Sequence, residues 1–361
     1  MTTAPTKRSP AATPATLTAQ DARGYILTSG DLACEVTDML DRVSRPDWRL
    51  ITTGVPALDR DVTIYPGSVA VVVGRPGMGK SQMLKALAMR EMREIQAKRA
   101  SDPGCMDVVV YVTLEESARK LGMQLGRLGS MRDIYRRQAD AADVRRRALY
   151  LVDLPIVVVR HPGIVDGRIA EPLSSGRTLR AVEQMVSDFG YTPKLICLDY
   201  LQLMQGDDDG PKYSARSKAD HVMAASHGAV MIARSLDTAV FLAVQSGRET
   251  DNRQPPLPQM SDMQHSSAIE QDADVILGLC RPMAIPAIRE AYLAGERPTV
   301  EAGGRSYPVT DNLALIGVCK SRDDDAAGRR YVARIDPVTM DIGGMATDGE
   351  APAWADRTAP V

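Results

Sequence analysis

The chain has 361 residues, 44% of them hydrophobic, a length that suits one large α/β domain or two domains of ordinary size. Its 44 basic and 46 acidic side chains leave a net charge of −2 with histidine neutral, which excludes a globally basic nucleic-acid binder, so any contact with a polyanion must come from a local patch. Aromatic residues make up only 4% of the chain, too few for a nucleic-acid platform built on many stacked rings.

The first residues are rich in Thr, Ala and Pro and lack the apolar stretch of a secretory signal. We expect residues 1–30 to form a disordered arm, with a targeting peptide as the alternative. No apolar run approaches the ~18–20 residues of a membrane span, so no membrane partner is expected. The five cysteines form no CxxC pair and are odd in number, which argues against a zinc ribbon and fits a reducing cytoplasm.

Residues 31–48 are predicted to form an amphipathic linker helix and its exit. Apolar side chains recur at helical spacing from Leu32 to Val43, and acidic residues occupy the other side. The run Ser44-Arg45-Pro46 separates this helix from the rest of the chain. Two interpretations stay open: the helix packs on its own domain, or it docks on a neighbouring subunit.

Residues 49–345 alternate compact apolar runs with amphipathic stretches, which predicts an α/β fold with a mostly parallel twisted sheet flanked by helices. The strands are expected at Val69–Val73, Val108–Thr113, Ile156–Arg160, Leu195–Leu198, Val240–Gln245, Val275–Leu279 and Leu313–Val318. Helices are expected over about 80–99, 116–128, 131–149, 178–189 and 214–236. Gly206–Gly210 and Arg248–Pro258 are expected to be surface loops, 282–310 an excursion before the last strand, and 346–361 a flexible tail.

The strongest motif is Gly74-Arg75-Pro76-Gly77-Met78-Gly79-Lys80-Ser81, a complete GxxxxGK[ST] pattern followed by Gln82. A strand precedes it and a helical run follows, which is the context of a phosphate-binding P-loop. The glycines let backbone N–H groups turn toward an anion, and the helix N-terminus adds positive potential. Lys80 would contact the β- and γ-phosphates, and the Ser81 hydroxyl would bind Mg²⁺. The sequence therefore predicts a nucleoside triphosphate site over residues 74–82.

Two further strand ends supply carboxylates. Asp199 follows the apolar run Leu195–Leu198, at the edge of the sheet where ligands of open α/β folds bind, and is expected to support the metal beside Ser81. The run Val108–Leu114 ends in Glu115-Glu116, and a carboxylate there can polarise water as a general base. These residues alone leave open which glutamate acts, because either one can instead be an acid placed for the helix dipole.

Two longer strings resemble a known family. Asp199-Tyr200-Leu201-Gln202-Leu203-Met204 and Ala268-Ile269-Glu270-Gln271-Asp272-Ala273-Asp274 are similar to the DYLQLM and SIEQDAD segments of DnaB-type replicative helicases, the second differing at one residue. The resemblance extends from about Thr53 to Gly344. It implies a RecA-like P-loop NTPase that assembles as a homo-oligomeric ring, usually hexameric, hydrolyses ATP with Mg²⁺ at subunit interfaces, and translocates 5′–3′ on single-stranded DNA.

The resemblance also implies catalytic roles. Glu115, in Thr113-Leu114-Glu115, matches the family's catalytic glutamate, and Gln245 matches the glutamine that senses the γ-phosphate. Lys320-Ser321-Arg322 is similar to the K-x-R motif that reaches into the neighbour's ATP site, with Lys320 and Arg322 as its cations and Arg322 as the arginine finger. Because Asp323-Asp324-Asp325 replace the usual neutral turn, pairing of Arg322 with these neighbours is the alternative.

The expected DNA contacts depart from the family pattern. Where the family has Arg-Glu-Ser-Gly, this chain has Gln264, His265 and Ser267, so phosphate contacts would come from backbone N–H groups, Gln and Ser without a cation. The loop around Gly206–Lys212 is the other candidate, although its aspartates would repel a phosphate backbone. The arginine-rich stretch Arg127–Arg147 is either a solvated or intersubunit face or a track for nucleic acid or a partner.

About fifty residues precede Thr52, whereas the family usually carries a sizeable helical domain there. Either the 31–43 helix alone serves as the linker, or another protein supplies a collar, and such trimming favours a phage or plasmid enzyme of the bacterial cytosol. The leading hypothesis is a ring-forming 5′–3′ helicase motor for DNA replication, with a loader, primase or collar protein as further partners. The alternatives are a RecA-like recombination-mediator or clock-type ATPase, and a nucleotide-gated single-stranded-DNA-binding or loader protein with weak turnover.

Overall fold

The computed structural model describes residues 28–45, 48–128, 134–165, 168–170, 172–199, 218–247, 250, 257–263, 266–302, 305–336 and 339–344. The chain forms two compact units, residues 1–49 and 50–361. Most of the predicted N-terminal arm, the predicted tail and the loop Gly206–Gly210 lie outside the described residues. No helix among these residues is long and apolar enough to span a membrane.

The first unit contains the helix α2 (Ser29–Val43), which begins two residues before the predicted start. Thr28 caps it: the Thr28 side chain accepts a hydrogen bond from the Asp31 backbone N–H, and Asp31 in turn accepts from the Thr28 backbone N–H at 2.7 Å. This reciprocal capping box satisfies two N–H groups that a helix start leaves free. None of the residues of α2 is buried, its apolar stripe from Leu32 to Val43 included.

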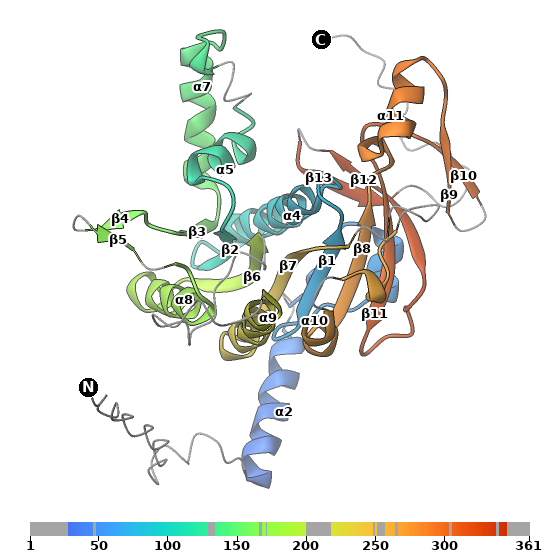
Figure 1. The fold of residues 1–361 in the computed structure, drawn as a ribbon. Helices are drawn as coiled ribbons and strands as arrows, with labels where there is room; N and C mark the ends of the chain where they lie inside the picture. Colours follow the sequence, from blue (N-terminus) through green and yellow to red (C-terminus); the bar gives the residue numbers. More distant parts are fainter. Residues whose placement is uncertain are drawn as a thin grey trace, which may run out of the picture. The chain divides into compact units, whose positions relative to one another are not determined.

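In the described part of the second unit, nine strands form one sheet in the order β13-β12-β11-β8-β1-β7-β6-β2-β3 (Figure 1). Neighbours from β8 to β3 pair in parallel, whereas β11, β12 and β13 add an antiparallel edge. The strands are β1 (Val69–Gly74), β2 (Asp107–Thr113), β3 (Ile156–Arg160), β6 (Thr192–Asp199), β7 (Ala239–Gln245), β8 (Val275–Cys280), β11 (Leu313–Ser321), β12 (Arg330–Asp336) and β13 (Asp341–Gly344). The predicted mostly parallel sheet is confirmed, and the last two strands were not predicted.

Helices cover both faces of this sheet. Alternate residues of the fully buried β1 point to opposite faces: Ala70 and Val72 belong to one core with α4, and Val71 and Val73 belong to another with α8 and α9. The helices of this unit are α3 (Pro56–Asp61), α4 (Lys80–Ser101), α5 (Ala118–Leu125), α7 (Ala141–Ala148), α8 (Ser175–Phe189), α9 (Lys218–Ser235), α10 (Ser266–Asp272) and α11 (Pro286–Leu293). Because helices cover both faces of the sheet at β1, all of its side chains are buried, which explains why its sequence is apolar throughout.

The helix predicted over 131–149 is not continuous: Ile134 and Tyr135 are helical, the chain then turns, and α7 begins at Ala141. Arg137 has a left-handed φ of 57°, which interrupts any continuous helix. Asp140 then starts a new helix, since its side chain accepts a hydrogen bond from the Ala142 backbone N–H at 2.8 Å. A 3₁₀ turn over Leu149–Asp153 follows directly.

The excursion at 282–310 is a packed element. It contains α11 and a hairpin of β9 (Thr299–Ala302) and β10 (Arg305–Pro308). Its apolar residues Ile285, Val300 and Tyr307 pack against a small buried cluster that includes Met78 of the P-loop. A second small hairpin, β4 (Ile164–Val165) with β5 (Arg168–Ile169), follows β3. In Figure 1 α10 lies below and α11 above β8, so the carboxyl edge of the parallel strands faces upward.

Candidate nucleotide-binding site

The P-loop lies at the carboxyl end of the central strand β1. Gly77 and Gly79 have φ values of 81° and 88°, which side chains other than glycine rarely adopt, and α4 begins directly after them at Lys80. An added Cβ at Gly79 would lie 2.6 Å from Cδ of Arg281. The turn therefore needs glycine at residue 79 both for its backbone conformation and for the close approach of a neighbouring side chain.

Lys80 is a buried cation without a carboxylate bound to it among the described residues. Its Nζ donates to the backbone oxygen of Arg75 at 3.1 Å. Burial lowers the pKa of Lys80 to about 8, although the carboxylates of Asp199 and Glu115 oppose this shift. A bound polyanion would supply the missing partner and favour the charged ammonium.

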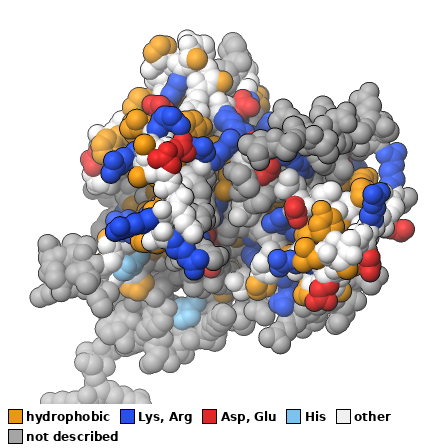
Figure 2. All heavy atoms as spheres, turned by 90° about the horizontal axis from the view of Figure 1, so that it is seen from above, with side chains coloured by type: hydrophobic (Ala, Val, Ile, Leu, Met, Phe, Trp, Pro, Cys, Tyr) orange, Lys and Arg blue, Asp and Glu red, His pale blue; other side chains and the backbone are white. Residues whose placement is uncertain are grey.

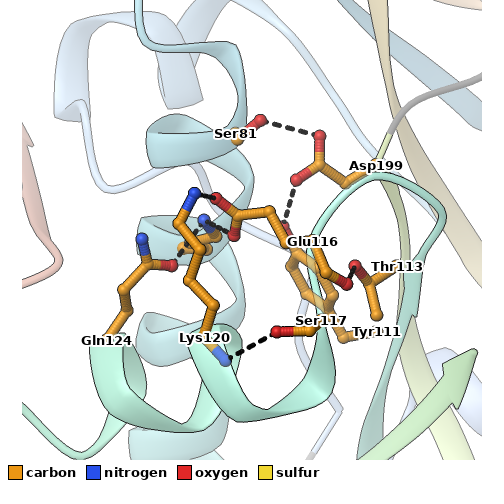
Figure 3. Close-up of polar contacts among 9 residues, drawn as sticks. Ser81, Tyr111, Thr113, Glu116, Ser117, Lys120, Gln124 and Asp199 are labelled. Atoms are coloured by element: carbon orange, nitrogen blue, oxygen red, sulfur yellow. Dashed lines mark hydrogen bonds and ion pairs between the residues drawn. The ribbon is translucent and has the colours of Figure 1, made fainter. Parts of the chain in front are cut away.

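Ser81 and Asp199 meet beside this lysine. The Ser81 hydroxyl donates to Oδ1 of Asp199 at 2.8 Å, and the buried Tyr111 hydroxyl donates to Oδ2 at 2.9 Å (Figure 3). Burial raises the pKa of Tyr111 well above its usual range, and the neighbouring Asp199 carboxylate adds to this shift, so Tyr111 remains a donor. A hydroxyl and a carboxylate oxygen are the hard ligands that Mg²⁺ prefers, so this pair fits the expected metal.

The two adjacent glutamates have different surroundings. Glu116 accepts from Nζ of Lys85 at 2.6 Å and from Nζ of Lys120 at 2.8 Å (Figure 3). Glu115 is exposed and lines the same cavity as Lys80 and Asp199. Because Glu116 is already held in ion pairs, Glu115 is the carboxylate that can act on a bound water.

A cavity of about 330 Å³ joins these groups. It is lined by Pro76, Gly77, Gly79, Lys80, Ser81, Gln82, Glu115, Asp199, Gln245 and Arg281. Gln245 ends β7 opposite Gly74 in the parallel register, which places it at the expected edge. The cavity brings together six of the predicted P-loop residues with four groups that follow or end other strands, Glu115, Asp199, Gln245 and Arg281.

Arg281, directly after β8, is a member of this cavity that the sequence did not reveal. Its Nη2 donates to the backbone oxygen of Asp311 at 2.6 Å, whereas its buried Nε has no hydrogen-bond partner among the described residues. Burial lowers the pKa of its guanidinium, although Asp311 opposes the shift. The only available signal was an arginine at the end of an apolar run, which is too common a pattern to predict a site.

A family model described as "DnaB-like helicase C terminal domain" matches residues 51–322, about three quarters of the chain. The chain belongs to this family. A "Replicative DNA helicase DnaB" from Rickettsia bellii is 25% identical over 255 residues, covering 69% of this chain and 47% of that protein. The protein of the same name from Leifsonia xyli subsp. xyli is 26% identical over 277 residues, covering 74% and 54%. The chain thus spans about half the length of the curated relatives it matches.

Two solved structures share the fold. "The Structure Of A DnaB-Like Replicative Helicase And Its Interactions With Primase" aligns with a TM-score of 0.62 at 17% identity, covering 91% of this chain and 70% of that one. A second solved structure, described as an "ATPase Domain", aligns with a TM-score of 0.61 at 19% identity, covering 89% and 100%. The expected resemblance to DnaB-type helicases, and with it the predicted α/β class, is confirmed.

In this member of the DnaB-like family, Lys320 and Arg322 lie at the opposite edge of the sheet from the cavity. Ser321 pairs with Val275, the first residue of β8, whereas the cavity is formed beyond the last residue of that strand. Arg322 makes an ion pair with Asp274 at 3.0 Å and donates to the backbone oxygen of Gln271 at 2.6 Å. Neither cation can therefore reach the nucleotide site of its own chain.

The alternative that Arg322 pairs with the three acids after it is wrong for two of them. Asp323 accepts from the hydroxyl of Tyr65 at 2.6 Å. Asp324 accepts from the backbone N–H of Thr63 at 2.8 Å. These hydrogen bonds connect the turn to the segment before β1. The ion pair of Arg322 is with Asp274, in the AIEQDAD segment.

Of the expected DNA-binding residues, only Ser267 is described, and it lies exposed near the start of α10. Gln264 and His265 lie outside the described residues. Viewed from above the carboxyl edge, Lys and Arg side chains gather over both the α7 side and the α11 side of the surface (Figure 2). On α7, Arg146 and Arg147 pair with Asp143, so part of the arginine-rich stretch is locally neutralised.

Proposed function

We propose that this chain is the ATP-hydrolysing motor of a ring-forming DNA helicase of the DnaB type, which translocates 5′–3′ on single-stranded DNA during replication. The observation that supports the proposal is that the P-loop and the expected finger residues lie at opposite edges of one sheet. The P-loop, Asp199 and Glu115 lie at the carboxyl edge, and Lys320 and Arg322 lie at the other. If Arg322 acts as the finger, a neighbour arranged head to tail would complete the site.

The proposed reaction is phosphoryl transfer from ATP to water. Glu115 accepts a proton from the attacking water, whose oxygen bonds to the γ-phosphorus while the bond to the β–γ bridging oxygen breaks, giving ADP and phosphate. Lys80 and the backbone N–H groups of the P-loop hold the phosphates, and Ser81 and Asp199 would hold Mg²⁺. The metal supplies charge neutralisation on the phosphate oxygens. Arg281 also lines this cavity and would add positive charge beside the bound nucleotide.

The neighbour's Arg322 would stabilise charge that develops on the transferred phosphoryl group. An arginine finger of this kind accelerates hydrolysis by about 10³–10⁵-fold, so an isolated subunit should be a poor ATPase. Arg322 must exchange its contacts with Asp274 and Gln271 for the nucleotide when the ring forms. Lys320, whose Nζ donates to the backbone oxygens of Glu270 and Ala273, lies beside it.

The proposal includes the expected partners. Single-stranded DNA would contact Gln264, His265 and Ser267 of each subunit, and Gln245 would relay the loss of the γ-phosphate to that loop. A hexameric ring encloses its strand, so weak contacts repeated around the ring replace a strongly basic surface. A loader, a primase or a collar protein would act with the ring in the cytoplasm.

The test combines ATPase rates, with and without single-stranded DNA, with the mass of the assembly in the presence of ATP. We expect a ring whose turnover rises with DNA. A monomer whose turnover ignores DNA would refute the helicase proposal, and a DNA-binding ring with negligible turnover would favour the nucleotide-gated binding protein.

Mixing Lys80→Ala with Arg322→Ala subunits tests the shared site. Random mixing in equal amounts pairs an intact P-loop with an intact finger at about one interface in four, so the mixture should exceed either variant alone. Arg330→Ala is the matched control, because this exposed arginine lies on β12 of the same hairpin. If the mixture is no more active than the Lys80→Ala or the Arg322→Ala protein alone, Arg322 does not act on the neighbour's site.

A further inference from the structure

An ion pair between the buried Lys85 and the partly buried Glu116 connects the P-loop helix to the turn that carries Glu115. Lys85 lies in α4, four residues after Ser81, and its side chain is 1% exposed. Its Nζ donates to Oε2 of Glu116 at 2.6 Å and to Oε1 of Gln124 in α5 at 2.7 Å. Figure 3 shows Glu116, Lys120 and Gln124 gathered beside α4.

The rest of this turn is fixed on both sides of Glu115. The Thr113 hydroxyl donates to the backbone oxygen of Glu116 at 2.7 Å. The backbone N–H of Leu114 donates to the backbone oxygen of Asp199 at 3.0 Å. Ser117 then caps α5 by accepting from the Lys120 backbone N–H at 3.3 Å. Glu115 lies between these anchors and lines the cavity, so its position follows from the contacts around it.

We propose that Lys85 and Glu116 are positioning residues, whose ion pair fixes the carboxylate of Glu115 relative to the phosphate cradle. The proposal rests on the hydrolysis assigned above to Glu115. The pair joins the helix that starts at the cradle to the residue adjacent to the base. Glu115 itself is exposed and lines the cavity. A shift of the turn would move Glu115 without disturbing Lys80 or Ser81.

Stability alone gives a weak reason for this arrangement. Taking an ammonium and a carboxylate out of water is costly, and replacing a buried ion pair with apolar residues of similar size is often neutral or stabilising. A hydrogen-bonded pair instead restricts the relative position of its two side chains, because hydrogen bonds are directional and apolar contacts are not. Hydrogen bonds from Lys120 and Lys85 outweigh the effect of burial and hold the pKa of Glu116 below its usual value, so the pair stays charged.

The experiment measures kcat and KM for ATP, together with the affinity for a fluorescent ATP analogue, in Lys85→Met, Glu116→Gln and the apolar pair Lys85→Met/Glu116→Met. We expect kcat to fall about 10²-fold in each, as a misplacement near 1 Å would cause, while KM and analogue affinity change less than about threefold. Lys98→Met is the matched control, since Lys98 joins the far end of α4 to Asp107 at the start of β2, at 3.1 Å.

A double-mutant cycle distinguishes positioning from packing. In a Glu115→Gln background, Lys85→Met should lower kcat no further, because the group that it positions is gone. Three results would each overturn the proposal. The apolar pair could recover the full kcat, the analogue affinity could fall by as large a factor as kcat, or the two substitutions could have additive effects in the cycle. If Lys85→Met fails to fold, the near-isosteric Glu116→Gln decides the same question. A Glu115→Gln variant as active as the unsubstituted protein would instead refute the proposed function.

Discussion

Replacing Gly79 with alanine separates two demands that the P-loop makes on one residue. The left-handed φ of 88° disfavours alanine by about 1–2 kcal/mol. The new Cβ would also lie 2.6 Å from Cδ of Arg281, so the arginine must move and give up its hydrogen bond to the oxygen of Asp311, worth about 1 kcal/mol. The expected loss in free energy of unfolding is therefore about 2–3 kcal/mol, with weakened nucleotide binding.

Gly77→Ala is the control, because Gly77 has a similar φ of 81° and no atom within 4 Å of the added Cβ. It should cost only the backbone part, about 1–2 kcal/mol. Urea unfolding followed by circular dichroism gives the stabilities, and titration with a fluorescent ATP analogue gives the affinities. In an Arg281→Ala background the two glycine variants should become equally costly. Equal costs already in the unsubstituted background would show that Arg281 does not crowd Gly79, and the reasoning would be wrong.

Leu84→Ala in α4 should cost about 2–5 kcal/mol in urea unfolding because the leucine is fully buried, whereas Leu293→Ala, 71% exposed, should stay within about 0.5 kcal/mol; similar costs would contradict the assigned core. Binding of a triphosphate should raise the pKa of Lys80 from about 8, so above pH 8 binding takes up a proton and the affinity falls by at most about tenfold per pH unit. Calorimetry at about pH 8.5 in two buffers of different ionisation enthalpy would reveal this proton uptake. If no proton is taken up, the lowered pKa of Lys80 in the free protein is refuted. Asp199→Ala should cost about 1–3 kcal/mol because the buried Tyr111 hydroxyl loses its acceptor, and adding Tyr111→Phe should recover part of this in thermal melts.

The sequence was most informative where function depends on neighbours along the chain. The P-loop is a local motif, and Asp199 follows from the rule that parallel strands bring their carboxyl ends to one edge. The choice between Glu115 and Glu116 required the structure, because the decisive partner, Lys85, lies 31 residues away on a helix. The resemblance to a family predicts Glu115 as the base, and the contacts of Glu116 give a physical reason to propose the same residue.

Long-range packing accounts for what was missed. Arg281 enters the cavity because β8 pairs beside β1, and nothing in its immediate sequence marks this. Buried residues alternate with exposed or partly exposed ones along β12, and β13 has only four residues, so neither strand shows the apolar run that identified the central strands. The extent of the helix predicted over 131–149 was wrong because arginine and alanine favour helix throughout, while the left-handed Arg137 has no sequence signal.

The position of β1 in the sheet also determines when this site can first exist. Its two partners, β7 and β8, lie more than 160 residues further along the chain, and no strand adjacent in sequence pairs with it. About 200 residues must therefore be synthesised after the P-loop before its supporting strands are available, which takes roughly 10–40 s at ordinary translation rates. During that interval the apolar β1 is without its pairing partners, and apolar strands in this state are prone to aggregate. The cavity also lacks Arg281 until β8 has been made, so the nascent chain cannot yet bind a nucleotide with the full set of lining residues.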